Sequence, residues 1–178
     1  MNTGQTLLTL GALMLISMII LNFNRAMNDI DSEMDFDRFK LEALSMLTSH
    51  SEQLSQYFFD EASTDTTTLK RLNDFTQPGS LGYEWNDGGN VDDIDDLHGV
   101  TVADTGISGV IYNVDYNIDY VTRSGSSIVT SGSRQYHKRV RISISDTFNP
   151  PLIYHLVGAN RVRDTLALEV VVSYWFYN

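Results

Sequence analysis

The sequence contains no cysteine, and this absence removes several chemistries at once. Disulfide bonds, thiolate metal sites, a cysteine nucleophile and cysteine-attached haem are excluded from these 178 residues. Basic residues are scarce as well: 12 Lys and Arg stand against 23 Asp and Glu, which gives a formal net charge of −11. Because phosphate backbones repel an acidic chain, we expect no nucleic acid among its partners.

Sequence motifs of known catalytic chemistry are also absent. The histidines are His50, His98, His137 and His155, and none belongs to an H-E-x-x-H pair. There is no G-x-S-x-G elbow and no phosphate-binding glycine loop. A carboxylate pair chosen among 23 acidic residues carries no information. We therefore predict that the chain is not an enzyme and uses no cofactor.

Neither proline nor charge interrupts the beginning of the chain. The first charged side chain is Arg25 and the first proline is Pro78. From Leu7 to Phe23 the sequence reads LLTLGALMLISMIILNF. A helix of roughly 17–20 residues spans about 26–30 Å, the thickness of a bilayer's hydrocarbon core. No Lys or Arg occurs before this run and no A-x-A motif follows it, so we expect a membrane-spanning or bundle-forming helix rather than a secretory signal.

The next segment keeps a helical period but becomes amphipathic. Its apolar side chains recur at steps of three and four residues: Phe36, Phe39, Ala43, Met46, Leu47, Leu54, Tyr57 and Phe58. Most charged residues of the segment lie on the other face, and such a stripe is typical of a helix that covers a protein core. We predict one long helix, apolar over 1–28 and amphipathic over 29–60.

Residues 61–98 are predicted to be an irregular, acidic connection rich in Gly and Thr. The run Asn86-Asp87-Gly88-Gly89 indicates a turn. An acidic cluster follows: Asp92, Asp93, Asp95 and Asp96. Its carboxylate oxygens suit Ca²⁺, although the EF-hand spacing is absent because the glycines precede the aspartates. The cluster is a weak calcium candidate, and the alternative is a solvated acidic turn.

From residue 99 to the end the period changes from 3.6 to 2. Apolar residues alternate with polar ones in three stretches: Val110, Tyr112, Val114, Tyr116, Ile118 and Tyr120; Val140, Ile142 and Ile144; Leu166, Leu168, Val170, Val172, Tyr174 and Phe176. This pattern predicts an antiparallel meander over 99–178, with a loop over 146–160 that contains Pro150-Pro151. Because a sheet needs a cover on one face, we predict an α+β fold in which the amphipathic helix packs on the sheet.

This organisation resembles the type IV pilin and pseudopilin superfamily, including archaellin-like filament subunits. Gly4-Gln5 followed by TLLTLGALMLIS is similar to segments in which a peptidase cuts after a glycine. The stretch DDIDDLHG over 92–99 is similar to an aspartate-rich element of some pilin-like bacterial proteins. The stretches YHKRV over 136–140 and VSYW over 172–175 resemble the sheet of the same proteins.

The resemblance implies a structural subunit of an extracellular, type IV pilus-like filament of identical chains. Before assembly such a subunit lies in the inner membrane, where a pilus assembly machinery handles it. The family usually has a glutamate at the fifth residue of the mature chain. That position is Gln5 if the mature chain starts at Met1, and Thr9 if it starts at Gln5. Two alternatives are a minor pilin or pseudopilin of a secretion machine and a membrane-anchored ligand-binding module.

Two groups of residues are predicted to mediate assembly. The first lies on the apolar helix, where small or polar side chains allow close packing: Gln5, Thr9, Gly11, Ala12 and Ser17. The second is a set of charges that can meet between subunits: Asp92, Asp93, Asp95 and Asp96 against Lys138, Arg139 and Arg141, with Arg134 and His137 beside them. The alternative for these charges is a solvated loop with cross-strand pairs inside one subunit.

Overall fold

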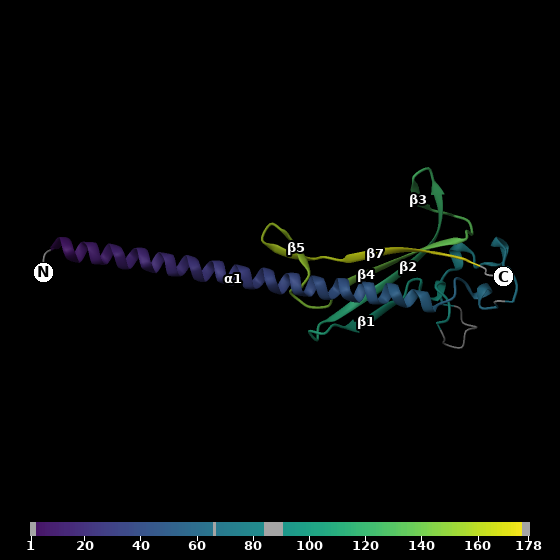
Figure 1. The fold of residues 1–178 in the computed structure, drawn as a ribbon, viewed down its shortest axis with the longest axis horizontal. Coiled ribbons are helices and arrows are strands. Elements are labelled where there is room, and N and C mark those ends of the chain that lie inside the picture. The colour runs from purple at the N-terminus through teal and green to yellow at the C-terminus, as the bar shows by residue number, and fades with distance from the viewer. Residues whose placement is uncertain (1–2, 66, 84–90, 176–178) are drawn as a thin grey trace. The chain divides into compact units, whose positions relative to one another are not determined.

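The computed structural model describes residues 3–65, 67–83 and 91–175. In these residues a single α-helix, α1 (Thr3–Gln53), comes first and all strands follow it (Figure 1). The chain divides into two compact units, residues 1–40 and 41–178. Each unit is described by itself.

The first unit contains the apolar part of α1. From Leu7 to Phe23 its large apolar side chains are 53–76% exposed, and they lie on every face of the helix. The helix is long and apolar enough to cross a membrane, and none of its most apolar window is buried within the chain. Its hydroxyl groups bond inside the helix: Thr9 Oγ1 donates to the Thr6 carbonyl (2.9 Å) and Ser17 Oγ donates to the Leu13 carbonyl (2.8 Å).

The second unit is built on an antiparallel sheet. Its main path runs β1 (Thr101–Thr105), β2 (Ile111–Ser124), β4 (His137–Asp146) and β7 (Leu166–Ser173), and every neighbouring pair is antiparallel. A further strand, β3 (Ser127–Thr130), pairs with the end of β2 as a hairpin. The predicted meander is therefore confirmed.

The alternation in β2 and β4 sets the two faces of the sheet. The inner-face residues are at most 6% exposed: Tyr112, Val114, Tyr116, Ile118, Tyr120, Val140, Ile142 and Ile144. The register pairs Val114 with Ile144 and Ile118 with Val140, so that apolar side chains lie beside each other across the strands. The inward residues of β7 are only half-buried, because β7 is an edge strand.

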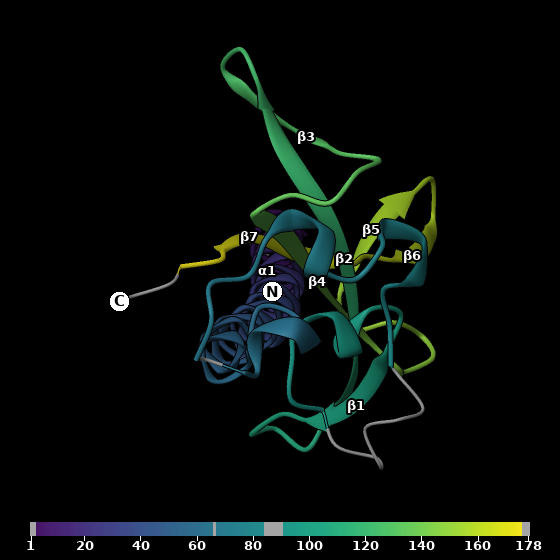
Figure 2. The same ribbon diagram turned by 90° about the vertical axis from the view of Figure 1, so that its right-hand side faces the viewer.

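The last turns of α1 cover this inner face. Three members of the predicted stripe are buried, namely Ala43, Leu47 and Leu54, the last of which begins a 3₁₀ turn, η1 (Leu54–Gln56). They follow one another at four- and seven-residue steps, so they lie on one side of the helix. Figures 1 and 2 show this end of α1 beside the sheet. The α+β architecture with a helix packed on the sheet is confirmed.

Polar contacts fix the same part of α1 to the edge of the sheet. Glu42 Oε1 accepts a hydrogen bond from the backbone N–H of Ser108 (2.7 Å) in the β1–β2 turn. Two turns further on, His50 Nε2 lies 3.1 Å from Asp104 Oδ2 on β1, and His50 Nδ1 lies 2.7 Å from the Tyr116 hydroxyl on β2. Burial raises the pKa of Tyr116 to about 12, so this hydroxyl keeps its proton.

Two expectations from the sequence are wrong. The segment 146–160 is not all loop, because β5 (Tyr154–Val157) pairs with β6 (Asn160–Arg163) in a separate hairpin. Gly158 has φ +66° in its turn, which lets the chain reverse there. The helix also ends before residue 60, so Phe58 leaves the helical stripe and is 42% exposed. Instead its backbone N–H and C=O bond to Asp92 and Ile94.

The connection between helix and sheet is irregular but packed. Its described residues form 3₁₀ turns: η2 (Glu61–Ser63), η3 (Leu72–Asp74), η4 (Pro78–Ser80) and η6 (Asp95–Leu97). Phe59 and Phe75 from this region form a buried cluster with Tyr120 of β2. The predicted turn at Asn86-Asp87-Gly88-Gly89 lies outside the described residues.

Candidate functional site

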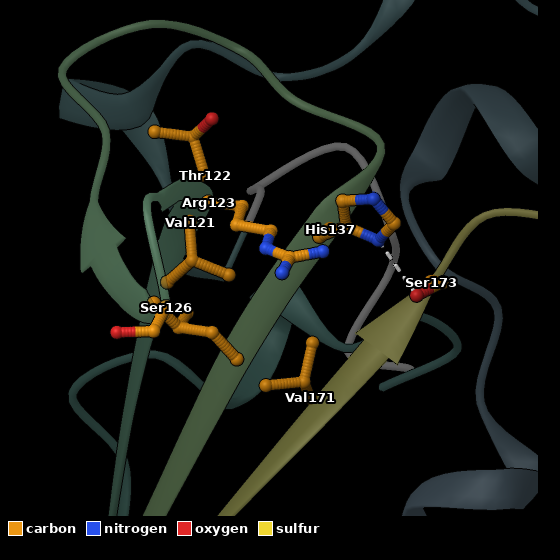
Figure 3. A pocket seen from close by; sticks show the side chains of 8 residues that line it. Val121, Thr122, Arg123, Ser126, His137, Val171 and Ser173 are labelled. Atoms are coloured by element: carbon orange, nitrogen blue, oxygen red, sulfur yellow. Dashed lines mark hydrogen bonds between the residues drawn. The ribbon is translucent and has the colours of Figure 1, made fainter.

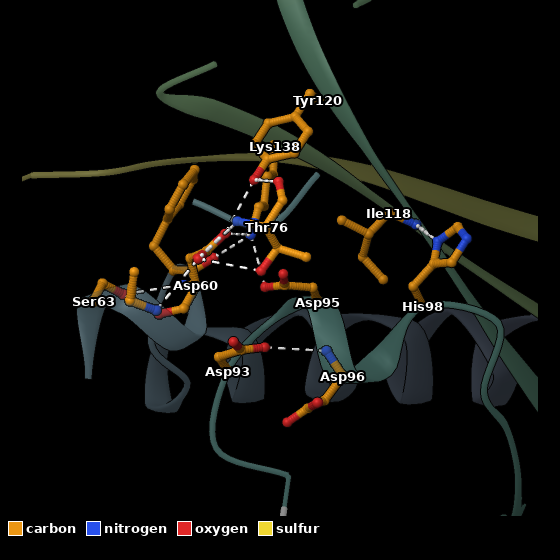
Figure 4. A network of polar contacts seen from close by, with 12 residues as sticks. Asp60, Ser63, Thr76, Asp93, Asp95, Asp96, His98, Ile118, Tyr120 and Lys138 are labelled. Atoms are coloured by element: carbon orange, nitrogen blue, oxygen red, sulfur yellow. Dashed lines mark hydrogen bonds and ion pairs between the residues drawn. The ribbon is translucent and has the colours of Figure 1, made fainter. Parts of the chain in front are cut away.

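A lysine occupies the inner face of the sheet. Lys138 lies on β4 in phase with Val140, and none of its surface is exposed. Its Nζ donates hydrogen bonds to the carbonyl of Phe59 (2.7 Å), to Asp60 Oδ2 (2.9 Å) and to Asp95 Oδ1 (2.7 Å). Figure 4 shows how these groups converge from segments that are far apart in the sequence. The ammonium thus joins two separate parts of the connection to the sheet.

The carboxylate of Asp60 accepts hydrogen bonds from several donors besides Lys138. Its carboxylate caps η2 by accepting the N–H of Ala62 (3.3 Å), and both of its oxygens accept the N–H of Thr76 (3.1 and 3.0 Å). The Tyr120 hydroxyl donates to Asp60 Oδ2 as well (3.0 Å). Burial and the neighbouring Asp60 raise the pKa of Tyr120 well above its usual range. Asp60 is therefore a buried acceptor held by neutral donors as well as by Lys138.

Three aspartates of the acidic cluster are buried beside this lysine. Asp93, Asp95 and Asp96 are each 3% exposed. The Asp96 N–H donates to Asp93 Oδ1 (3.1 Å), and the Asp92 N–H donates to Asp96 Oδ2 (3.3 Å). Burial, together with Asp95, raises the pKa of Asp93 to about 8, so Asp93 is protonated at neutral pH.

These positions correct the predictions for the acidic cluster. It is not a solvated turn, because Asp93, Asp95 and Asp96 are buried in the second unit. In the part of the chain that the structure describes, no group of three or more Asp, Glu or His side chains is arranged to hold a metal ion. The geometry therefore gives no support to calcium binding at this cluster.

Aromatic rings surround the lysine. The Phe59 ring centroid lies 4.5 Å from Lys138 Nζ and the Tyr120 centroid lies 5.1 Å from it. Phe75 packs edge-on against Phe59 and against Tyr174, with ring centroids 5.2 Å apart in both pairs. Rings at this distance stabilise a cation and keep water away from it.

Two of the other predicted intersubunit charges, Arg139 and Arg141, have partners within the chain. The prediction of an intersubunit role for Lys138 is wrong, because Lys138 is fully buried and pairs with Asp95 of its own chain. On the outer face, Arg139 lies 3.2 Å from Asp119 on β2, and Arg141 lies 3.9 Å from Glu169 on β7. These pairs are the cross-strand pairs inside one subunit that were given as the alternative to intersubunit contacts. An intersubunit role for Asp92, Arg139 and Arg141 stays a prediction.

A pocket of about 440 Å³ lies on the outer face under the β2–β3 hairpin (Figure 3). Its lining combines apolar and polar side chains: Val121, Thr122, Arg123, Ser126, Ile128, His137, Val171 and Ser173. His137 Nδ1 lies 2.7 Å from Ser173 Oγ, and Arg123 Nε donates to the Gly125 carbonyl (2.9 Å). Because two basic side chains and no carboxylate line it, the pocket suits a small anionic ligand with an apolar body.

The first group of predicted assembly residues lies on the first unit. Gln5, Thr9, Gly11, Ala12 and Ser17 are exposed along the apolar part of α1. A side-chain carbon added at Gly11 meets nothing within 4 Å in the chain. This surface is therefore open to lipid or to another helix, and the small residues form shallow places on it.

The sequence contained a signal for part of the buried cluster. Lys138 stands at the two-residue spacing of Val140, Ile142 and Ile144, which places it on the inner face. Sequence reasoning nevertheless grouped it with the exposed basic residues. Asp60 was missed entirely, and no local pattern marks it, because its partner Lys138 lies 78 positions away. Comparisons with protein-family models, with curated proteins and with solved structures found no match for the chain.

Proposed function

We propose that this chain is a structural subunit of an extracellular, type IV pilus-like helical filament, assembled through the apolar part of α1. One observation carries the proposal: from Leu7 to Phe23 the helix is apolar and exposed on all its faces. Such a surface needs a cover of lipid or of other helices. The second unit has its own core, so it can fold while the first unit exchanges one cover for the other.

Close packing supplies the driving force in this proposal. Lipid is as apolar as Leu or Ile, so moving the helix from lipid into a bundle gains little by hydrophobicity. Gly11, Ala12 and Ser17 allow neighbouring helices to approach, and Met14 and Met18 adapt to neighbours that are not equivalent. Identical head-to-tail contacts that do not close produce an open helical polymer. The inner membrane holds the subunit before assembly, and the cell surface carries the filament.

Bulky substitutions at the small residues test the proposal. In Gly11→Leu and Ser17→Leu we expect membrane insertion and a folded second unit, but few or no filaments by electron microscopy. Gly132→Leu is the matched control, since a side chain there meets nothing within 4 Å and lies in the second unit. Normal polymerisation of both helix variants would show that this packing does not drive assembly.

The pocket favours a second candidate function, a membrane-anchored module that binds a small anion. In that case α1 serves only as an anchor, and Arg123 with His137 recognises the ligand. A thermal-shift screen of small carboxylates on the full chain in detergent tests this function, with Arg123→Gln as the control. Stabilisation of the wild-type chain but not of Arg123→Gln, with unchanged binding by Gly11→Leu, favours the binding module. If no carboxylate stabilises the wild-type chain, this function is excluded.

A minor pilin or pseudopilin role uses the same helix as the filament subunit and differs in the abundance of the subunit.

A further inference from the structure

The buried lysine is in hydrogen-bond contact with two carboxyl groups. Lys138 Nζ lies 2.7 Å from Asp95 Oδ1 and 2.9 Å from Asp60 Oδ2. The side chains of Lys138, Asp60 and Asp95 are 0%, 1% and 4% exposed. An amine held in contact with a carboxyl group, in one orientation and without water, has the geometry of a reactant pair for amide formation.

The two carboxyl groups differ in their surroundings. Both oxygens of Asp60 accept backbone N–H groups, and Oδ2 also accepts the Tyr120 hydroxyl. These donors stabilise a carboxylate, and an amide at this position would lose part of that set. Asp95 Oδ1 faces Lys138, and Asp95 acts on the buried carboxyl group of Asp93 and helps to raise the pKa of Asp93. Asp95 is therefore the electrophile that suits the site, and Asp60 is the base.

We propose that Lys138 and Asp95 condense into an intramolecular isopeptide bond, with Asp60 as proton acceptor and Asp93 as proton donor. Asp60 takes a proton from the Lys138 ammonium, and the free amine bonds to Cγ of Asp95. The bond from Cγ to one carboxyl oxygen then breaks. That oxygen leaves as water with two of the three ammonium protons, while the third stays on the amide nitrogen. Asp60 and Asp93 relay protons and are restored, and no oxidant, reductant or co-reactant takes part.

The surroundings favour the product. Two buried ions become one uncharged amide, so the cost of keeping charges out of water is relieved. The rings of Phe59 and Tyr120 lie over the nitrogen and exclude the water that would hydrolyse the bond. Asp93 can act as the acid because burial raises its pKa to about 8 and it holds a proton at neutral pH.

A pair whose carboxylate is exposed provides the contrast in the same chain. Lys70 Nζ lies 2.9 Å from Asp65 Oδ2, a distance equal to that between Lys138 and Asp60, but the Asp65 side chain is 54% exposed. The hydrogen bonds from Thr67 and Lys70 hold the pKa of Asp65 far below its usual range, so this carboxylate stays ionised in water. We expect no bond at this pair.

The bond would matter to a filament subunit, although the inference does not depend on that function. It joins residues 43 positions apart and ties η6 to β4. A covalent tie at this place resists the separation of the connection from the sheet under tension.

Mass spectrometry of the denatured full-length chain tests the proposal. The chain is purified in detergent, its intact mass is measured, and its proteolytic peptides are mapped. We expect an intact mass lower than the sequence mass by one water, and one peptide that contains both Lys138 and Asp95. Lys138→Arg and Asp60→Asn should restore the full mass, while Lys70→Arg should show the same deficit as the wild type.

The intact mass and peptide map of the wild-type chain are sufficient to test the bond, so a variant that fails to fold does not weaken the test. A full wild-type mass with separate Lys138 and Asp95 peptides overturns the proposal. A water loss that maps to any other residue also counts against it. A bond from Lys138 to Asp60 overturns the assignment of the electrophile and the base.

Discussion

Two leucines of the same helix have opposite surroundings. Leu15, in the first unit, is 64% exposed, whereas Leu47, in the second unit, is 1% exposed. Both belong to α1, so helix propensity does not distinguish them. Leu47 is covered by the chain's own sheet domain, while Leu15 needs a cover from outside the chain. We therefore expect changes in the first unit to affect membrane insertion and the proposed assembly, and changes in the second unit to affect folding.

The largest effect is expected from a charge in the apolar part. Leu15→Arg places a cation where only lipid or apolar helices are expected, at a cost of about 2.5–3.5 kcal/mol for insertion. We expect a loss of membrane insertion on the order of a hundredfold and no filaments. Membrane flotation and electron microscopy measure both.

Leu41→Arg is the control, since Leu41 belongs to the second unit and is 67% exposed. It should insert and assemble normally. If Leu15→Arg also inserts and assembles normally, the two parts of the helix do not differ as described.

In the second unit, a change in the buried cluster of Lys138, Asp60 and Asp95 is expected to affect folding. Lys138→Met leaves Asp60 and Asp95 buried without the lysine nitrogen that they share, and we expect a loss of about 3–5 kcal/mol in the free energy of unfolding. Urea titration of the full chain in detergent measures it. Lys70→Met, at a pair whose carboxylate is exposed, should lose about 0–1 kcal/mol. Equal losses in the two variants would contradict the structural role of the cluster.

A cavity beneath the helix is expected to have a smaller effect. Leu47→Ala should lower the free energy of unfolding by about 3 kcal/mol, because it removes buried methyl groups from the contact between α1 and the sheet. Leu44→Ala, at a position that is 44% exposed, should cost less than about 1 kcal/mol. Neither change should alter the membrane-bound fraction. A lower membrane-bound fraction for Leu47→Ala would show that the two parts are not independent.

The smallest effect is a dependence on pH. The pKa of Asp93 is raised from 3.8 to about 8 in the folded chain, so folding takes up a proton between these values. Stability therefore falls as the pH rises from about 4 to about 8, and Asp93→Asn removes this loss. We expect the variant to become steadily more stable relative to the wild type as the pH rises from 4 to 8. A difference that does not change between pH 4 and pH 8 would contradict the protonated state of Asp93.

The sequence predicts the elements better than it predicts how they meet. The four- and seven-residue steps of Ala43, Leu47 and Leu54 and the alternation of β2 and β4 are local patterns, and the structure confirms them. The sequence does not predict the β5–β6 hairpin, because the two prolines before it indicate a loop. The pairing of Lys138 with Asp60 depends on tertiary packing, which no spacing in the sequence reports.

Gly106 is a single position at which the sequence likewise does not report a tertiary contact. A side-chain carbon there would clash with the carboxyl group of Glu42, which bonds to the β1–β2 turn. The need for glycine arises from a contact between α1 and this turn, and the two lie far apart in the sequence. A turn signal alone predicts a glycine nearby, but it does not predict which glycine is required for packing.

Electron cryomicroscopy of material sheared from the surface of cells that make the chain tests the central claim most directly. The account predicts helical filaments whose core is a bundle formed by the apolar parts of α1, with the sheet domains outside. Recovery of the chain only in the membrane fraction, with no filaments in the sheared material, would contradict it.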